Sequence, residues 1–138
     1  ATVLSHLEID ERPKFVIADC GYSDLHKLLE YQLKQRYKLP SFPFIPLAAK
    51  LVKMRAGFNI EEVSPIKVVS NTDTPILFIH GEDDDYVPTY MGKELFEAKN
   101  DKKELYIAPK AKHAEALVKN IKQYEKVVSD FLDKYYNH

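Results

Sequence analysis

Cysteine is almost absent from the 138-residue sequence, where Cys20 stands alone. A single thiol excludes an internal disulfide and a framework of cysteine-ligated zinc, and it favours a reducing, cytoplasmic setting. No apolar run approaches the roughly 20 residues that a bilayer-spanning helix needs. Lys and Arg number 20 against 21 Asp and Glu. This balance gives no electrostatic reason to expect nucleic acid or an anionic membrane as a partner.

The sequence has ordinary globular composition, with 45% hydrophobic and 30% charged residues. Its length suits one domain with a real core, and it contains no internal repeat or low-complexity tract. We find no signal peptide, but the chain begins at Ala1 rather than at methionine. We therefore leave open that an upstream segment has been removed.

Three short apolar runs, residues 15–20, 75–80 and 104–108, each end at a loop. They are nearly continuous rather than alternating, as is typical of strands buried on both faces of a parallel sheet. Helical segments lie between and after these runs. The order predicts an α/β fold of three parallel strands with flanking helices and right-handed crossovers.

The clearest helix is expected over 120–136, where six apolar residues share one face at helical spacing. These residues are Ile121, Tyr124, Val128, Phe131, Leu132 and Tyr135. Thr89 is expected to be the N-cap of another helix, which carries the apolar residues Met91, Leu95, Phe96 and Ala98.

The connection from Gly21 to Thr74 is long for one crossover and is expected to contain two helices. The second begins near Pro46 and runs to Met54, after a stiff aromatic elbow at 39–44. Its apolar residues lie nearly all round, so it needs cover on more than one side. A lid or pocket wall and ordinary core packing both satisfy that need.

A run of four acidic residues follows the second apolar run, in the segment His80–Pro88. Taken alone, such a run is usually a solvated loop. A calcium loop of the EF-hand type needs ligands at alternating positions, which a contiguous run does not provide. A carboxylate that orients a histidine needs only one correctly placed acid, at the strand-end edge where α/β sheets form their sites.

His113 lies in the loop after the third apolar run. Its imidazole titrates near pH ~6.5 and suits a general base if a carboxylate holds its tautomer. A lone loop histidine is usually only exposed. Here, however, acid and histidine follow neighbouring strands at the same edge, which favours a functional pair.

The segment from Pro75 to Pro88 resembles the H-G-x-x-D-x-x-V-P segment of α/β-hydrolases, and 103–114 resembles that family's last strand and its histidine. Residues 16–24 and 62–66 are similar to bacterial members near the serine-aminopeptidase and acyltransferase-like branches. The resemblance covers essentially the whole chain. It implies that Asp84 is the acid and His113 the base of a catalytic triad, in the family's chain order.

One part of the family pattern is missing. No G-x-S-x-G occurs among the four glycines, and residues 1–7 resemble the helix just past that nucleophile elbow. The resemblance therefore implies that residues 1–138 are the C-terminal part of one hydrolase domain, with 25–57 as a helical lid-like insertion. The serine and the oxyanion-hole donors would lie upstream.

Other candidate nucleophiles and ligands have simpler interpretations. We expect Cys20 to be a small buried hydrophobe rather than a nucleophile, and Ser23 to cap a helix. Ser5 and Ser64 have no elbow around them. We expect His80 to support the acidic loop through a hydrogen bond. The remaining histidines form no ligand pattern and are expected at the surface: His6, His26 and His138.

The sequence thus predicts a parent serine hydrolase that cleaves an ester, thioester or amide through an acyl-serine intermediate, without a cofactor or metal. Asp84 and His113 would supply acid and base, and this chain alone would be inactive. Expected partners are a small acyl substrate and the missing N-terminal half of the domain. Without that half we expect self-association, because a strand edge is exposed. The alternative is a non-catalytic α/β module that binds a ligand or protein, and a metal-binding acidic loop is a third interpretation.

Overall fold

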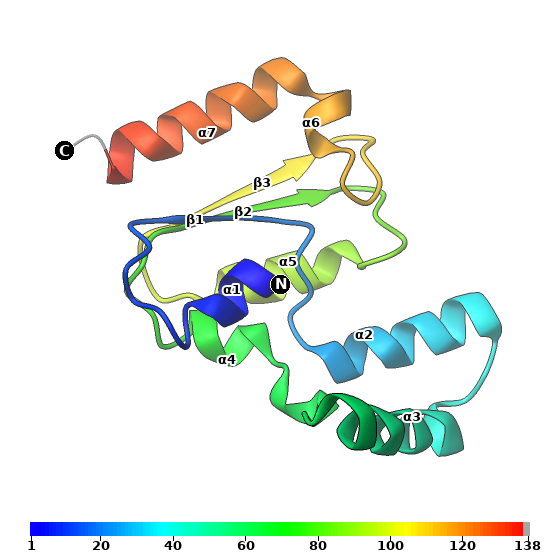
Figure 1. Ribbon diagram of the computed structural model, residues 1–138. Helices are drawn as coiled ribbons and strands as arrows, with labels where there is room; N and C mark the ends of the chain where they lie inside the picture. Colours follow the sequence, from blue (N-terminus) through cyan, green and yellow to red (C-terminus); the bar gives the residue numbers. More distant parts are fainter. Residues whose placement is uncertain (137–138) are drawn as a thin grey trace.

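The three apolar runs of sequence become three strands: β1 (Val16–Asp19), β2 (Ile76–Gly81) and β3 (Lys103–Ala108). The computed structural model describes residues 1–136, in which these strands form a parallel sheet of order β1-β2-β3 with helices on both faces (Figure 1). The predicted α/β class and the parallel three-stranded sheet are confirmed. Among the described residues β1 pairs only with β2, so its outer edge is open. Self-association through that edge stays a prediction.

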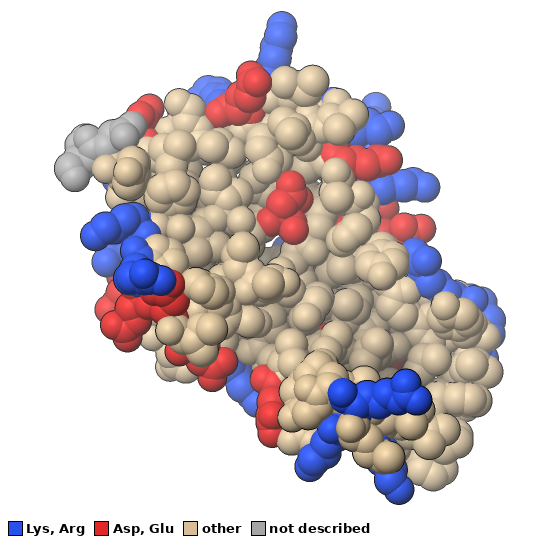
Figure 2. Space-filling view, viewed as in Figure 1, with Lys and Arg blue, Asp and Glu red and all other residues tan. Residues whose placement is uncertain are grey.

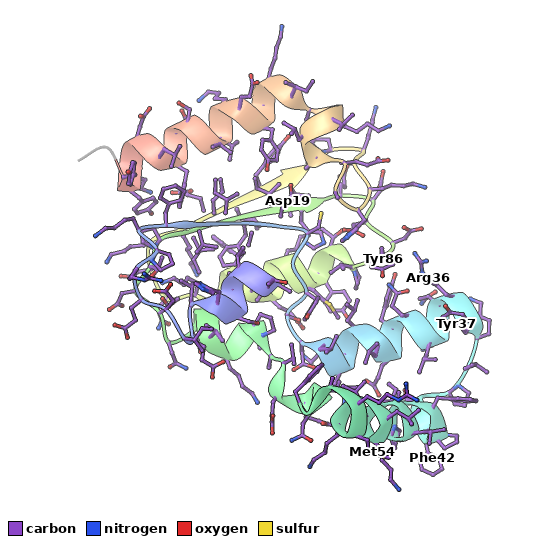
Figure 3. The ribbon with its side chains drawn as sticks, in the orientation of Figure 1. Asp19, Arg36, Tyr37, Phe42, Met54 and Tyr86 are labelled. Atoms are coloured by element: carbon purple, nitrogen blue, oxygen red, sulfur yellow. The ribbon has the colours of Figure 1, made fainter. Side chains whose placement is uncertain are left out.

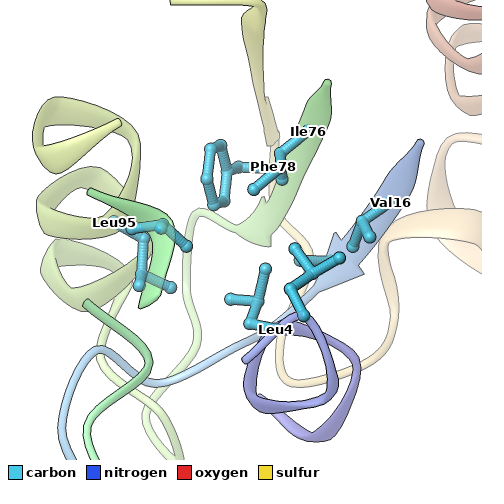
Figure 4. Packing of buried hydrophobic residues seen from close by; sticks show 8 residues of the cluster. Leu4, Val16, Ile76, Phe78 and Leu95 are labelled. Atoms are coloured by element: carbon cyan, nitrogen blue, oxygen red, sulfur yellow. The ribbon is translucent and has the colours of Figure 1, made fainter. Parts of the chain in front are cut away.

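Alternation along the strands divides their side chains between two cores, because successive residues point to opposite faces. One core is covered by α1 (Thr2–His6), α4 (Pro65–Val69) and α5 (Thr89–Ala98). Figure 4 shows this layer, in which Leu4, Phe78 and Leu95 pack with at most 2% of their surface exposed. The short helix α4 was not predicted from the sequence.

The other core lies under α6 (Ala116–Lys119) and α7 (Ile121–Tyr135), on the opposite face of the sheet (Figure 1). Phe131 is 1% exposed and meets the Phe15 ring edge-on at 6.2 Å. The predicted helix and most of its apolar stripe are confirmed. The assignment of Ile121 to the stripe is wrong, because Ile121 lies at the start of the helix and is 53% exposed.

The long connection after β1 holds α2 (Leu25–Gln32), a π-helical turn (Leu33–Tyr37), α3 (Ser41–Ala56) and a 3₁₀ turn (Ile60–Glu62). Helix α3 begins five residues before the predicted start at Pro46, across a kink at non-helical Phe42. Pro46 is tolerated because it lies close to the helix start after that kink. The two helices of the insertion are thus present, and a lid role for them stays a prediction.

Two predicted helix caps are wrong. Thr89 is the first residue of α5, and its hydroxyl donates to the carbonyl of Gly81 at 2.8 Å, which ties the helix to the end of β2. Asp24 caps α2, whereas Ser23 is fully buried and donates to Glu94 at 2.6 Å. In each case a contact with another secondary-structure element replaced the local one that propensity favoured. None of the helices in residues 1–136 combines the length and the apolarity needed to cross a membrane.

Candidate functional site

The candidate site lies where β2 and β3 end, because parallel neighbours deliver their exit loops to one edge of the sheet. The two loops are joined by backbone hydrogen bonds. Glu82 N donates to Ala108 O and Asp83 N donates to Ala111 O, both at 2.9 Å. The loop that carries the acids and the loop that carries His113 are therefore one connected unit.

Gly81 permits this close approach. A Cβ built at Gly81 would lie 2.4 Å from Ala111 O and 2.5 Å from Lys112 O, which is too close for any side chain. The absence of a side chain lets the loop after β3 cross directly over the end of β2. This crossing brings His113 above the acidic loop.

The two carboxylate oxygens of Asp84 have separate tasks. Oδ1 accepts the backbone N–H groups of Tyr86 and Val87, both at 2.9 Å, and so shapes the loop as an Asx turn. Oδ2 lies 2.8 Å from Nδ1 of His113. Because Oδ1 is fixed by the backbone, the direction in which Oδ2 points is fixed as well.

Asp84 is thus the acid that contacts His113, as the family spacing predicted, while Asp83 and Asp85 are exposed. The His113 side chain is 37% exposed. Its Nε2 makes no hydrogen bond within residues 1–136, so this nitrogen can meet a group from outside the described chain. The catalytic roles of Asp84 and His113 stay predictions.

The Asp84 carboxyl is kept ionised by its donors. Burial by itself would raise its pKa, but hydrogen bonds from His80, His113 and the amides of Val87 and Tyr86 hold the pKa well below its ordinary value. The side chain of Asp84 has no exposed surface. A buried carboxylate with this set of donors is oriented and negatively charged at neutral pH.

His80 is the second imidazole against Asp84. Its Nε2 lies 2.9 Å from the Val87 carbonyl and 3.3 Å from Asp84 Oδ2, so the ring proton lies on Nε2 and serves both oxygens. Nδ1 is buried without a partner among the described residues, and Gly92 lies against it. A Cβ at Gly92 would come 2.4 Å from this atom. The predicted support of the acidic loop by His80 is therefore present.

Cys20 lies closer to this site than its sequence context indicated. It follows β1 with a left-handed φ of 51°, and its Sγ accepts the Ala114 N–H at 3.3 Å. Burial raises the pKa of the thiol to about 12, so the thiolate nucleophile is scarce at neutral pH. Cys20 is buried, as predicted, and is placed as a packing residue beside His113.

Cys20, Asp84 and His113 each offer a ligand atom within 4.8 Å of the others, which is metal-like spacing. Their chemistry fits a metal poorly. A metal needs the thiolate, and the pKa of Cys20 opposes it. A metal would also have to replace the hydrogen bonds that already occupy the Asp84 carboxylate. The arrangement suits proton transfer better than metal binding.

Sequence reasoning missed the residues that cover His113. The Tyr86 ring lies 4.9 Å from the His113 ring, and Arg36 lies 4.7 Å above the Tyr86 ring. Gln32 donates to the Tyr86 carbonyl. Figure 3 shows Arg36 and Tyr86 meeting between the insertion and the strand-end loop. No sequence signal links these positions, because the contact joins segments about fifty residues apart.

The other sequence candidates lie outside this unit. Within residues 1–136 no hydrogen bond joins Ser5, Ser23 or Ser64 to His113. His6 and His26 are exposed or half-buried and face nearby acids, namely Asp10 and Glu30 at 3.7 Å. His138 lies outside the described residues.

Comparison with known proteins agrees with this architecture. Residues 42–138 match the prolyl oligopeptidase family of peptidases. A Bacillus subtilis (strain 168) protein, YqkD, described as uncharacterized, is 43% identical over 119 residues. That alignment covers 86% of this chain and 39% of YqkD, so the chain spans well under half of this relative.

Solved structures share the fold at low identity. The acylaminoacyl peptidase of Pyrococcus horikoshii superposes with a TM-score of 0.68 and 19% identity, over 97% of this chain and 22% of its own. The Pyrococcus furiosus esterase Pf2001 superposes with a TM-score of 0.66 and 19% identity, over 96% of this chain and 48% of the esterase. The α/β hydrolase GrgF from a Penicillium species superposes with a TM-score of 0.63 and 19% identity, over 98% of this chain and 60% of GrgF. With a family match across most of its length, the chain belongs to the prolyl oligopeptidase family and forms a C-terminal portion of the α/β-hydrolase fold.

Proposed function

We propose that the protein is a serine hydrolase that cleaves a small acyl substrate, an ester, thioester or amide, through an acyl-serine intermediate. The observation that carries this proposal is the 2.8 Å contact between Asp84 Oδ2 and His113 Nδ1 at the carboxyl ends of adjacent parallel strands. In this mechanism Asp84 holds the imidazole with Nε2 directed away from the carboxylate. His113 takes the serine proton through Nε2 and later gives it to the leaving group.

The serine would come from residues that precede Ala1, and the position of α1 supports this. A Cβ built at Gly21 would lie 3.3 Å from Ala1 N, so α1 starts beside the residue that follows Cys20. Cys20 Sγ in turn lies within 4.8 Å of the ligand atoms of Asp84 and His113. Residues just before Ala1 would thus be at the edge of the site, where a nucleophile elbow must place its hydroxyl.

The test uses the protein together with the residues that precede Ala1 in its gene. We expect it to hydrolyse activated acyl esters and to be labelled by a fluorophosphonate on a serine upstream of Ala1. His113→Gln should abolish both signals, whereas His26→Gln, a change at a half-buried histidine that pairs with Glu30 outside the site, should leave them intact. The 138-residue chain alone should turn over no ester.

Three outcomes would contradict the proposal. Absence of labelling and turnover in the longer protein would favour the non-catalytic binding module. Full activity in His113→Gln would remove the base. Turnover by the 138-residue chain that disappears in Cys20→Ser would make the thiol the nucleophile.

A further inference from the structure

The insertion separates the charges of the chain. Residues 31–60 contain no Asp or Glu and carry six cations. These are Lys34, Arg36, Lys38, Lys50, Lys53 and Arg55, and all six are exposed. Residues 31–60 therefore carry a charge of +6 and the rest of the chain a charge of −7. The net charge of −1 is the sum of the two and does not show this division. Within residues 1–136 none of the six forms an ion pair with an acid.

Helix α3 is the outermost element of this region. It packs on α2 and the 3₁₀ turn, away from the sheet (Figure 1). Ile45 is its one buried residue. The side of α3 that faces away from α2 thus has no cover from the described chain, and Phe42 and Met54 project from it in Figure 3.

Large apolar side chains lie along that uncovered side. Four of them recur at spacings of three, four and three residues, which places them on one stripe of α3, and a fifth follows the Gly57 cap that ends the helix. The stripe consists of Phe44, Leu47, Leu51 and Met54, exposed by 40%, 58%, 51% and 73%, and Phe58 beyond the cap is 41% exposed. We call this stripe, together with Lys50, Lys53 and Arg55, the basic apolar face.

Cations flank the stripe on both sides. At 100° per residue, Lys50 falls on one side of Leu47 and Leu51, and Arg55 falls on the other. Figure 2 shows Lys and Arg side chains over the region of α3, on a surface that is otherwise largely uncharged. Apolar exposure also continues onto the π-helical turn before α3, where Tyr37 is 67% exposed, and onto the kinked start of α3, where Phe42 is 76% exposed. The exposed apolar surface is thus broader than one helix stripe.

We propose that the basic apolar face docks on the surface of an anionic lipid bilayer, a property that does not depend on the proposed hydrolase function. A continuous exposed apolar patch marks an interaction surface. Helices with Lys and Arg beside a Phe- and Leu-rich face lie in the interface of anionic membranes, and their long cationic side chains reach the headgroups.

Other occupants fit less well. A symmetric contact between two copies through this face would bring six cations against six, with no acid in either insertion. One acidic partner helix would cover the stripe but not the exposed residues of the preceding turn. We expected no membrane partner because the net charge of the whole chain is close to zero. That net charge does not show that the cations are gathered in residues 31–60 and the acids lie elsewhere.

The experiment measures vesicle binding by the protein with the residues that precede Ala1. We expect flotation with vesicles of equimolar phosphatidylcholine and phosphatidylglycerol, and little with phosphatidylcholine alone. Lys50→Gln, Lys53→Gln and Arg55→Gln combined should lower partitioning about fivefold per charge, or roughly a hundredfold. Leu51→Ser should lower it about fivefold, because about half of that side chain is free to enter the lipid.

The matched control removes the same charge on the opposite side of the sheet, through Lys119→Gln, Lys122→Gln and Lys126→Gln combined. We expect at most a few-fold loss, with circular dichroism confirming that every variant is folded. Four results would overturn the proposal: no flotation, equal flotation with both vesicle types, equal loss in the control, or binding to an acidic helical peptide without binding to vesicles.

Discussion

Replacing Asp84 by asparagine tests the site with almost no change in shape. The introduced asparagine can keep the two backbone N–H bonds through its side-chain oxygen, because Tyr86 and Val87 both donate to Oδ1. Its amide NH₂ would then face Nδ1 of His113, where Asp84 now accepts at 2.8 Å. Two donors would meet, so His113 must change its tautomer or turn away.

The structure separates the effects on stability and on rate. His113 is 37% exposed and can satisfy its N–H with water. The buried His80 keeps the Val87 carbonyl at 2.9 Å. We therefore expect a loss of only about 1–2 kcal/mol in the free energy of unfolding. The rate should fall far more, because loss of the orienting carboxylate in a triad costs about ten-thousand-fold, or roughly 5.5 kcal/mol.

The pH dependence gives a second measure. The pKa of Asp84 is lowered in the folded state, so its stabilising contribution is complete above the unfolded value of about 3.9 and is lost as the pH falls through the lower folded value. The stability gap between the natural protein and Asp84→Asn should therefore narrow below about pH 4. Urea denaturation across pH and acyl-ester turnover in the longer protein provide the two readouts.

The controls are the neighbouring exposed acids. Asp83→Asn and Asp85→Asn remove the same charge from the same loop, and each should change turnover by less than about threefold. If either equals Asp84→Asn in effect, or if Asp84→Asn loses tenfold or less, then another group orients His113. In that case the assignment of the acid is wrong.

Two further predictions follow from the packing around this pair. Gly92→Ala should lower the free energy of unfolding by roughly 1–3 kcal/mol, because the added Cβ would lie 2.4 Å from His80 Nδ1. This loss should exceed the gain of about 1 kcal/mol that alanine brings to a helix. A raised melting temperature would contradict the prediction. Cys20 should resist a thiol reagent at pH 8 in the folded protein and should react fully in denaturant. A pKa of about 12 leaves only about one thiol in ten thousand as the thiolate at pH 8. Rapid labelling of the native protein would show instead that the thiol is accessible and activated.

The strands and the pairing of Asp84 with His113 were predictable for a common reason. Both depend on patterns that act along the sequence: apolar runs make buried strands, and parallel neighbours bring their ends together. Family spacing then selected Asp84 among three consecutive aspartates. The contact follows once β2 and β3 are adjacent and Gly81 lets their loops cross.

What escaped prediction depends on contacts between different secondary-structure elements. Thr89 and Ser23 have good capping chemistry, yet Gly81 and Glu94 offered their hydroxyls other acceptors. The position of Cys20 beside His113 requires a left-handed backbone at the end of β1, which nothing in an apolar run indicates. Local propensity favours one partner, and tertiary structure decides between partners.

The charge of the insertion illustrates a different limit. A net charge of −1 is an average over the chain, and an average cannot exclude a partner that contacts only one face. The acids lie outside residues 31–60, and the apolar residues of α3 face outward because α2 occupies its other side. The apolar character of α3 was visible in the sequence, but whether it meant core or surface depended on what packs against it. Among residues 1–136 the other elements bury a single residue of α3, Ile45. Ordinary core packing therefore does not describe α3 within these residues.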